Sequence, residues 1–235
     1  KVFASAGYEV ASQLDDGIID LAFDLRPTDD VTAAVDRRER LAEAASVRRM
    51  LEPATVALID AGAGGPRSTT DPGRRPVPIE DGCLVRLAER LRDGAFPGSV
   101  TLGGPAALDE LPEGVDLVVV AGPAAALPEV LDRCADRAAG AVVVLSEADA
   151  SQTEAILEVV RRRGLRLLGP GSLGVCNTDP AVALDALCVE ARPLPGTIGV
   201  LSESGEVVSS VLDHARRVGL GISTLVSTAE PADLN

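Results

Sequence analysis

Short apolar segments alternate with amphipathic ones between residues 55 and 168, and this alternation constrains the fold more than any other feature. The apolar segments are rich in Val, Leu, Ile and Ala and lie at 55–60, 99–102, 115–120, 141–145 and 165–168. The amphipathic segments, which predict helices, lie at 82–92, 124–136 and 151–163. Neighbouring parallel strands need a crossover helix between them. The order therefore predicts a doubly wound parallel sheet in a Rossmann-like α/β domain.

The composition agrees with helices packed on a sheet and excludes two kinds of binding surface. The 235 residues are 46% hydrophobic, with three Phe, one Tyr and no Trp. The formal net charge is −14, whereas nucleic-acid binding needs a basic face, so no nucleic-acid partner is expected. No apolar segment reaches the length of a membrane span, and no basic amphipathic segment predicts membrane-surface binding. We expect a cytoplasmic protein whose ligand is a small molecule.

The cysteines and the single histidine predict neither a metal site nor a catalytic set. The cysteines are Cys83, Cys134, Cys176 and Cys188. Their spacing fits neither a zinc motif nor a small disulfide-rich domain, so four reduced, mostly buried thiols are predicted. His214 follows Asp213 on a predicted helix, where adjacent side chains point in different directions. His214 is therefore interpreted as structural, and no catalytic or metal-binding residue is predicted.

Five regions are predicted along the chain. The first contains two strands joined by a turn at Asp15-Asp16-Gly17, and the second is a charged linker helix. The regions are the end of an upstream domain (1–28), the linker helix (29–52), the Rossmann-like domain (53–175), an irregular connector (176–196) and the start of a second, truncated α/β domain (197–235).

Candidate binding residues follow the predicted strands, because ligands of open α/β sheets bind beyond the carboxyl ends of the strands. Glycine-rich turns and helix N-termini there present N–H groups to anions. These candidates are Gly62, Gly64, Gly82, Pro123, Ala124, Ser146, Glu147, Gly169, Pro170, Gly171 and Ser172. A second set, in the turn before the predicted helix 205–218, consists of Ser202, Ser204 and Gly205.

Two of these motifs carry a family resemblance. GPGSLG at 169–174 and SESG at 202–205 resemble the GPNCLG and SQSG motifs of the NDP-forming acyl-CoA synthetases and the succinyl-CoA synthetase α subunit. The resemblance implies a CoA-binding domain followed by a flavodoxin-like domain, with coenzyme A or acyl-CoA as ligand. It also implies that Ser202, Ser204 and Gly205 are the remnant of a phosphate site. The sequence FASAGYE at 3–9, followed by the predicted hairpin, resembles the C-terminal end of GNAT acetyltransferases, which implies a fusion protein.

The chain also departs from that family pattern. Asp60 replaces a glycine, Gly171 and Ser172 replace Asn and Cys, and Glu203 and Glu206 add carboxylates that repel phosphate. These changes favour a degenerate, regulatory CoA-binding domain in an acetyltransferase fusion. Two alternatives stay open: the active half of an ADP-forming acyl-CoA ligase, and a non-catalytic oligomerisation or interaction domain. A dinucleotide-dependent oxidoreductase fits less well, because GxGxxG is not intact.

The same alternatives leave three properties open. The fragment itself is either non-catalytic or half of a ligase, and CoA binding is either kept or lost. A protein partner, if there is one, would be a second copy of this chain or the fused acetyltransferase domain.

Overall fold

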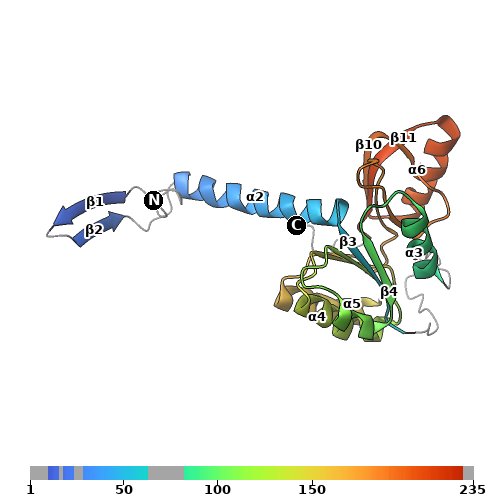
Figure 1. The fold of residues 1–235 in the computed structure, drawn as a ribbon, viewed down its shortest axis with the longest axis horizontal. Coiled ribbons are helices and arrows are strands. Elements are labelled where there is room, and N and C mark those ends of the chain that lie inside the picture. Colours follow the sequence, from blue (N-terminus) through green and yellow to red (C-terminus); the bar gives the residue numbers. More distant parts are fainter. Residues whose placement is uncertain (1–9, 16–17, 24–28, 63–81, 230–235) are drawn as a thin grey trace. The chain divides into compact units, whose positions relative to one another are not determined.

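The computed structural model describes residues 10–15, 18–23, 29–62 and 82–229 (Figure 1). The chain divides into two compact units, Lys1–Val47 and Arg48–Asn235. None of the described helices is both long and apolar enough to cross a membrane.

The first unit contains the predicted hairpin and most of the linker helix. Strands β1 (Val10–Asp15) and β2 (Ile18–Phe23) pair antiparallel, with Asp15 opposite Ile18. Residues 1–9, which belong to the region predicted to end an upstream domain, lie outside the described part of the chain. Helix α2 (Asp29–Leu51) spans the segment for which the sequence predicts a helix. Most of its side chains from Val31 onwards are exposed, as its mixed charge pattern predicts.

The second unit is built on a five-stranded parallel sheet, which confirms the predicted α/β class (Figure 1). Its strands are β3 (Thr55–Asp60), β4 (Ser99–Gly103), β5 (Leu117–Ala121), β6 (Ala141–Val144) and β7 (Leu167–Leu168). The spatial order is β4-β3-β5-β6-β7, and each neighbouring pair is parallel. The chain therefore steps to one side of β3 and then returns to the other side.

Helices and 3₁₀ turns connect these strands. They are α3 (Cys83–Asp93), the 3₁₀ turns Pro105–Glu110 and Ala124–Ala126, α4 (Leu127–Asp136) and α5 (Ala150–Arg163). The helix expected from residue 124 begins with the second 3₁₀ turn, so the regular α-helix starts three residues later. Helix α5 begins where the sequence supplies a capping box between Asp149 and Gln152. Hydrogen bonds from Gln152 and Ser151 lower the pKa of Asp149, because they stabilise its carboxylate.

The sheet is buried on both faces, as its continuous apolar strands predict. Ala57 and Ile59 face one core, together with Leu127 and Leu131 of α4 and Ile156 of α5. The intervening strand residues point to the opposite face, where α3 packs on β3 and β4. The aliphatic side chains therefore allow helices to pack closely on both faces of the sheet.

A second sheet follows the first within the same unit. Its strands are β8 (Gly174–Asn177), β9 (Leu184–Leu187), β10 (Leu194–Ser202) and β11 (Gly221–Ser227), in the order β10-β11-β8-β9. Helix α6 (Gly205–Val218) connects the parallel strands β10 and β11. The stretch 176–196, expected to be an irregular connector, instead supplies β9 and parts of β8 and β10. Its short strands pair antiparallel between turns, a pattern with little sequence signal.

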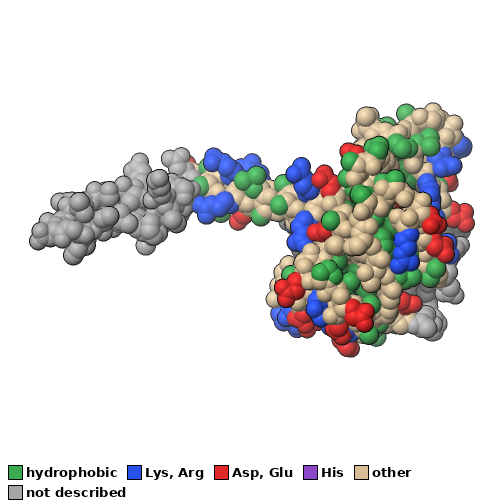
Figure 2. All heavy atoms as spheres, viewed as in Figure 1, with side chains coloured by type: hydrophobic (Ala, Val, Ile, Leu, Met, Phe, Trp, Pro, Cys, Tyr) green, Lys and Arg blue, Asp and Glu red, His purple; other side chains and the backbone are tan. Residues whose placement is uncertain are grey.

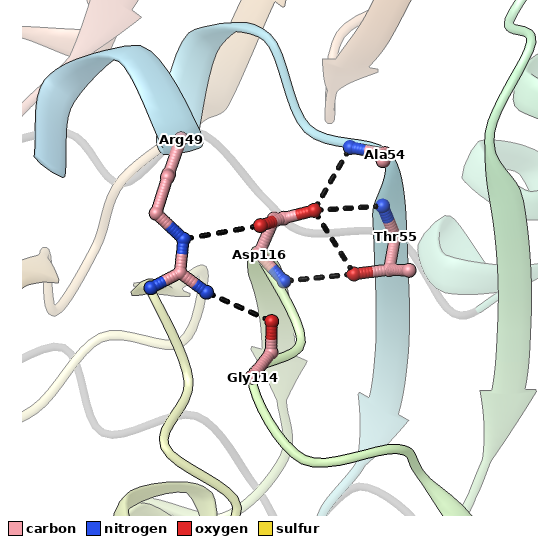
Figure 3. A network of polar contacts seen from close by, with 5 residues as sticks. All are labelled: Arg49, Ala54, Thr55, Gly114 and Asp116. Atoms are coloured by element: carbon pink, nitrogen blue, oxygen red, sulfur yellow. Dashed lines mark hydrogen bonds and ion pairs between the residues drawn. The ribbon is translucent and has the colours of Figure 1, made fainter. Parts of the chain in front are cut away.

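A polar network fixes the amino-terminal edge of the first sheet (Figure 3). One carboxylate oxygen of Asp116 accepts hydrogen bonds from the amides of Ala54 and Thr55, at 2.9 and 3.1 Å, and from the Thr55 hydroxyl. The other oxygen accepts from Nε of Arg49 at 3.1 Å. Arg49 also donates to the Gly114 carbonyl oxygen. The network joins the end of α2 to the starts of β3 and β5.

A disulfide between Cys83 and Cys188 joins α3 to the segment after β9, with 6.1 Å between the Cα atoms. The prediction of four reduced thiols is therefore wrong for this pair. The two cysteines are 105 residues apart, and only the packing of α3 against β9 brings them together. Cys134 and Cys176 are free and buried, and burial raises the pKa of each to about 12.

Charged side chains of both signs are interspersed over the described residues on the face shown in Figure 2. Some charged side chains of neighbouring helices form exposed ion pairs, such as Arg162 of α5 with Asp132 of α4. Such pairs contribute little to stability individually. The two cores and the Asp116 network therefore determine where the elements of the second unit lie.

We predict that Asp116→Asn lowers the free energy of unfolding by about 2–4 kcal/mol, because it removes the Arg49 ion pair and, with its one oxygen kept on the strand amides, turns an NH₂ donor towards the Arg49 Nε donor. Asp116 has a side-chain exposure of 19%, whereas Asp109, which pairs with Arg133, has 66%. Asp109→Asn is the matched control, with an expected loss under about 1 kcal/mol. Urea unfolding of both variants measures the difference, and equal losses would contradict this role for Asp116.

A second prediction concerns Asp185 on β9. Burial raises the pKa of its carboxyl group, although Arg90 and Arg192 partly offset the effect. Among the described residues its buried Oδ1 has no hydrogen-bond partner. The pKa of Asp185 is therefore higher in the folded chain than in the unfolded chain, where it is about 3.9. Between these two pKa values, the free energy of unfolding falls as the pH rises.

Asp185→Asn removes this titration. The difference in unfolding free energy between variant and wild type should therefore shift in favour of the variant between pH 3 and pH 7. The exposed Asp213→Asn serves as control. A difference that stays constant would show that the arginines balance the cost of burial, and one that moves the other way would show that they outweigh it; either result contradicts the prediction.

Candidate functional site

The candidate site lies at the carboxyl edge of the parallel sheet, where the strand order reverses. β3 and β5 are adjacent, but the chain leaves β3 towards β4 on one side and leaves β5 towards β6 on the other. Such a switch point leaves a crevice beyond the strand ends, where open α/β sheets bind ligands. Pro123, after β5, lies close to Gly62, after β3: a Cβ atom built on Gly62 would be 3.6 Å from the Pro123 Cδ atom.

The turn after β3 is held by its own acidic residue. The exposed Asp60 accepts a hydrogen bond from the Gly62 amide through Oδ1, at 3.0 Å. The Ala61 amide donates to the Ala121 carbonyl oxygen at 2.7 Å, which binds the two switch-point turns together. The Asp60 carboxylate therefore already accepts a hydrogen bond from the Gly62 amide, which could otherwise donate to a phosphate group. Gly64, the other candidate in this turn, lies outside the described residues.

The turn after β5 depends on Ser146, from the turn after β6. The Ser146 hydroxyl oxygen accepts a hydrogen bond from the Gly122 amide at 2.7 Å. Gly122 has a φ of +147°, and a Cβ atom there would be 2.8 Å from the Cβ atom of Ala61. Only glycine fits this position without displacing the first turn. Pro123 and Ala124 then begin the 3₁₀ turn and are half-buried.

The GPGSLG loop joins this edge to the second sheet. The Gly171 amide donates to the Ser146 carbonyl oxygen at 2.8 Å, and the Gly169 amide to the Thr228 carbonyl oxygen at 3.1 Å. Gly169 and Pro170 are buried, and Gly171 is half-buried. Gly171 is therefore the member of this loop that the structure leaves most accessible at the edge.

Ser172 is fully buried, and its hydroxyl group serves the fold. The hydroxyl donates to the Ser227 carbonyl oxygen and accepts from the Gly174 amide. The Ser227 hydroxyl in turn accepts from the Leu173 amide. These bonds satisfy the loop internally and attach it to the end of β11.

Glu147 adds a second exposed carboxylate to the edge. Its Cγ atom would lie 3.7 Å from a Cβ atom on Gly171, so its side chain adjoins the GPGSLG loop. Together with Asp60 it makes the two ends of the site acidic. An anionic ligand would have to be held by backbone amides and by basic groups from outside these turns.

The N-terminus of α3 supplies such groups. Gly82 is the N-cap residue of α3, is exposed, and has no side chain with which to cap the helix. The Arg86 guanidinium folds back towards it, since its Nη1 atom would be 3.9 Å from a Cβ atom on Gly82. Sequence reasoning selected Gly82 but missed Arg86, because the direction of a helical arginine cannot be inferred from its position alone.

The second candidate set forms an ordinary helix start. The Ser204 hydroxyl caps α6 by accepting from the Val207 amide at 3.3 Å, and the Ser202 hydroxyl accepts from the Ser204 amide. Gly205 is the first residue of α6, and Glu206 lies in its first turn. The hydroxyl groups of Ser202 and Ser204 thus already have partners within the protein. The Glu206 carboxylate also disfavours the binding of a phosphate group at this helix start.

His214 lies away from both sets. It is exposed and lines an apolar hollow of about 530 Å³ between β10 and α6, together with Ile198, Val207 and Leu220. Within the described ranges, no three His, Cys, Asp or Glu side chains are close enough together to hold a metal ion. The structure therefore brings together Gly62, Pro123, Ser146 and Gly171, but not His214.

Comparison with known proteins connects this edge to a ligand class. Residues 98–178 match the family described as the CoA binding domain. This range includes Pro123, Ser146 and the GPGSLG loop, but not the turn after β3. Acetate–CoA ligase (ADP-forming) I of Archaeoglobus fulgidus is 32% identical over 133 residues, which cover 54% of this chain and 19% of the ligase. Acetate–CoA ligase (ADP-forming) of Methanocaldococcus jannaschii is 32% identical over 130 residues, covering 53% and 18%.

Part of the chain is homologous to the CoA-binding domain of ADP-forming acyl-CoA synthetases. The matched part spans about a fifth of the length of these two ligases.

Solved structures agree on the fold. The dinucleotide-forming acetyl-coenzyme A synthetase 1 of Ca. Korarchaeum cryptofilum, in complex with phosphate and ADP, has a TM-score of 0.64 at 20% identity. That alignment covers 80% of this chain and 40% of the synthetase. PH0766 from Pyrococcus horikoshii OT3 has a TM-score of 0.64 at 17% identity, covering 80% and 43%. The two sheets of the second unit thus follow an established arrangement.

We predict that Gly122→Ala disrupts the switch point. The added methyl group would strain the backbone at φ +147° and collide with Ala61, so a loss of about 2–4 kcal/mol in unfolding free energy is expected. Gly164→Ala is the matched control, since Gly164 also has a positive φ but nothing lies within 4 Å of its added Cβ atom. Its expected cost is about 1 kcal/mol. Thermal or urea unfolding distinguishes the two, and a Gly122→Ala variant as stable as the control would contradict the close approach of the turns.

Proposed function

We propose that this chain binds coenzyme A or an acyl-CoA at the carboxyl edge of its first sheet and acts as a regulatory, non-catalytic domain. The observation that carries this proposal is the convergence of Gly62, Pro123, Ser146 and Gly171 on one edge, in a region homologous to CoA-binding domains. Backbone with small side chains lets an extended ligand approach closely.

The anionic groups of CoA need positive potential, and the α3 N-terminus is the part of this edge that offers it. Its first-turn amides carry partial positive charge, and Arg86 adds a guanidinium beside Gly82. The exposed carboxylates of Asp60 and Glu147 disfavour phosphate groups beside the turns that follow β3 and β6. We therefore assign the phosphate end of the ligand to the Gly82 side.

The start of α6 supports a regulatory role over phosphoryl transfer. At α6, Ser204 caps the helix and Glu206 adds negative charge, so neither the amides nor the field there favours a phosphoryl group. Binding could thus persist where catalysis has been lost. The resemblance of residues 3–9 to GNAT acetyltransferases supports a fusion partner that such a domain would regulate.

The active half of an ADP-forming acyl-CoA ligase is the alternative, because the matched relatives are named as such ligases. That reading requires the Ser202, Ser204 and Gly205 turn to accept a phosphoryl group. The two functions therefore differ in what happens at α6, while both require CoA binding at the sheet edge.

Calorimetric titration of the 235-residue chain with CoA and acetyl-CoA tests the proposal. We expect a dissociation constant on the order of micromolar. Gly82→Glu should weaken binding by at least about tenfold, because its carboxylate would face the phosphate end of the ligand. Gly164→Glu is the matched control, since it makes the same change at another exposed helix terminus with positive φ.

The result that would contradict the proposal is an affinity weaker than millimolar in a folded wild-type chain. Equal weakening by Gly82→Glu and Gly164→Glu would contradict the assignment of the phosphate end. Neither result depends on catalysis, so both apply equally to the regulatory and the ligase readings.

A further inference from the structure

The disulfide between Cys83 and Cys188 lies where α3 meets the second sheet, next to the candidate ligand edge. Cys83 is the first residue of α3 and directly follows Gly82. Cys188 directly follows β9, and its amide donates to the Leu173 carbonyl oxygen at 2.7 Å. The bond therefore attaches the first turn of α3 to the end of β9, which is far from it in the sequence.

The two cysteine residues are buried to different extents. Cys83 is 4% exposed, whereas Cys188 is half-buried and more accessible to a reagent in solution. A thiol attacks the sulfur that it can reach along the axis of the disulfide bond, so accessibility favours Cys188 as the target. Cys83 is then the leaving group.

The position of Cys83 suits a leaving thiolate. It lies at the N-terminus of an 11-residue helix, where free amides and the helix dipole stabilise negative charge. The Arg86 guanidinium beside Gly82 adds to the positive potential. A stabilised thiolate leaves faster in thiol–disulfide exchange.

We propose that Cys83 and Cys188 form a thiol–disulfide exchange site for low-molecular-weight thiols. A thiolate RS⁻ attacks the Sγ atom of Cys188 and forms a mixed disulfide. The bond to Cys83 breaks, and its electron pair leaves with Cys83 as a thiolate, which then takes up a proton. A second thiol attacks the mixed disulfide, releases the Cys188 thiol and leaves as RSSR. The protein disulfide is thereby reduced and two RSH are oxidised, and RSSR drives the reverse reaction.

Reduction would release one half of α3 only. Arg90, in the second half of the helix, donates to the Leu187 carbonyl oxygen at 3.0 Å and is close enough to Asp185 to affect its pKa. These contacts keep the C-terminal part of α3 on β9 after the disulfide opens. The first turn loses its covalent attachment and becomes more dynamic. If the proposed function holds, the redox state thereby sets how well the Gly82 side of the edge is ordered for its ligand.

The remaining cysteines provide internal controls. Cys134 and Cys176 are buried, and burial disfavours their thiolate forms. Thiolates are the reactive species. Both thiols should therefore stay unmodified in the folded chain under conditions in which Cys83 and Cys188 exchange.

The first test incubates the full chain with glutathione at defined ratios of reduced to oxidised form, blocks free thiols with N-ethylmaleimide and maps them by mass spectrometry. We expect the Cys83–Cys188 bond to form in oxidised buffer and to open in reduced buffer. With oxidised glutathione, the Cys83→Ser variant should form an adduct at Cys188 at least about tenfold faster than Cys188→Ser forms one at Cys83, because accessibility limits the reaction. Four free thiols in oxidised buffer, or equal adduct rates, would overturn the proposal.

The second test uses wild-type protein and so does not depend on how the variants fold. Hydrogen exchange at the Arg86 amide, which bonds to the Gly82 carbonyl oxygen, should accelerate at least about tenfold on reduction, while exchange at Val160 in α5 stays unchanged. Unchanged exchange at Arg86 would overturn the coupling of the disulfide to the α3 first turn.

A final comparison separates this inference from the proposed function. Desulfo-CoA, which has no thiol to exchange, is titrated into oxidised and reduced protein. Tighter binding to the oxidised form supports both proposals. If desulfo-CoA binds neither form while the exchange tests hold, the exchange site stands and the proposed function fails.

Discussion

The reversal of strand order between β3 and its two neighbours is the constraint on which the remaining structure depends. Consecutive parallel strands require crossover connections, and those that leave the adjacent strands β3 and β5 run to opposite sides. The turns at Gly62 and Gly122 must then share one edge, where Gly122 has no room for a side chain. At the opposite edge, the Asp116 network fixes where β3 and β5 begin. Hydrogen bonds to the Asp116 carboxylate thus hold the amino-terminal edge of the sheet together, whereas small residues line its carboxyl edge.

At the carboxyl edge, side chains of the protein already accept hydrogen bonds from some of the backbone amides. Asp60 and Ser146 satisfy two amides that would otherwise be available to a ligand. Satisfying a turn internally stabilises the free protein, but it adds the cost of displacing these groups to any binding that uses the same amides. We therefore expect a ligand to lie along the carboxyl edge. Its phosphate groups are not expected to enter the turn after β3, where Asp60 accepts from the Gly62 amide.

The sequence predicted the parallel sheet because apolar runs such as 115–120 and 141–145 can be buried only between layers of helices. It also identified the edge residues, since strand ends and glycine turns are local features. It did not predict β8 and β9, which are short and depend on β11 for pairing. Nor could it predict the Cys83–Cys188 bond or the backbone contacts of Ser172, because these join segments that are brought together only by the packing of the two sheets.

The most direct measurement is the map of backbone amide NMR shifts of the chain during titration with CoA. The account predicts that the largest changes appear at Gly62, Gly122, Ser146 and Gly171 and in the first turn of α3, with little change around the hollow between β10 and α6. Changes confined to that hollow, or to the N-terminus of α6, would contradict a ligand site at the carboxyl edge of the first sheet.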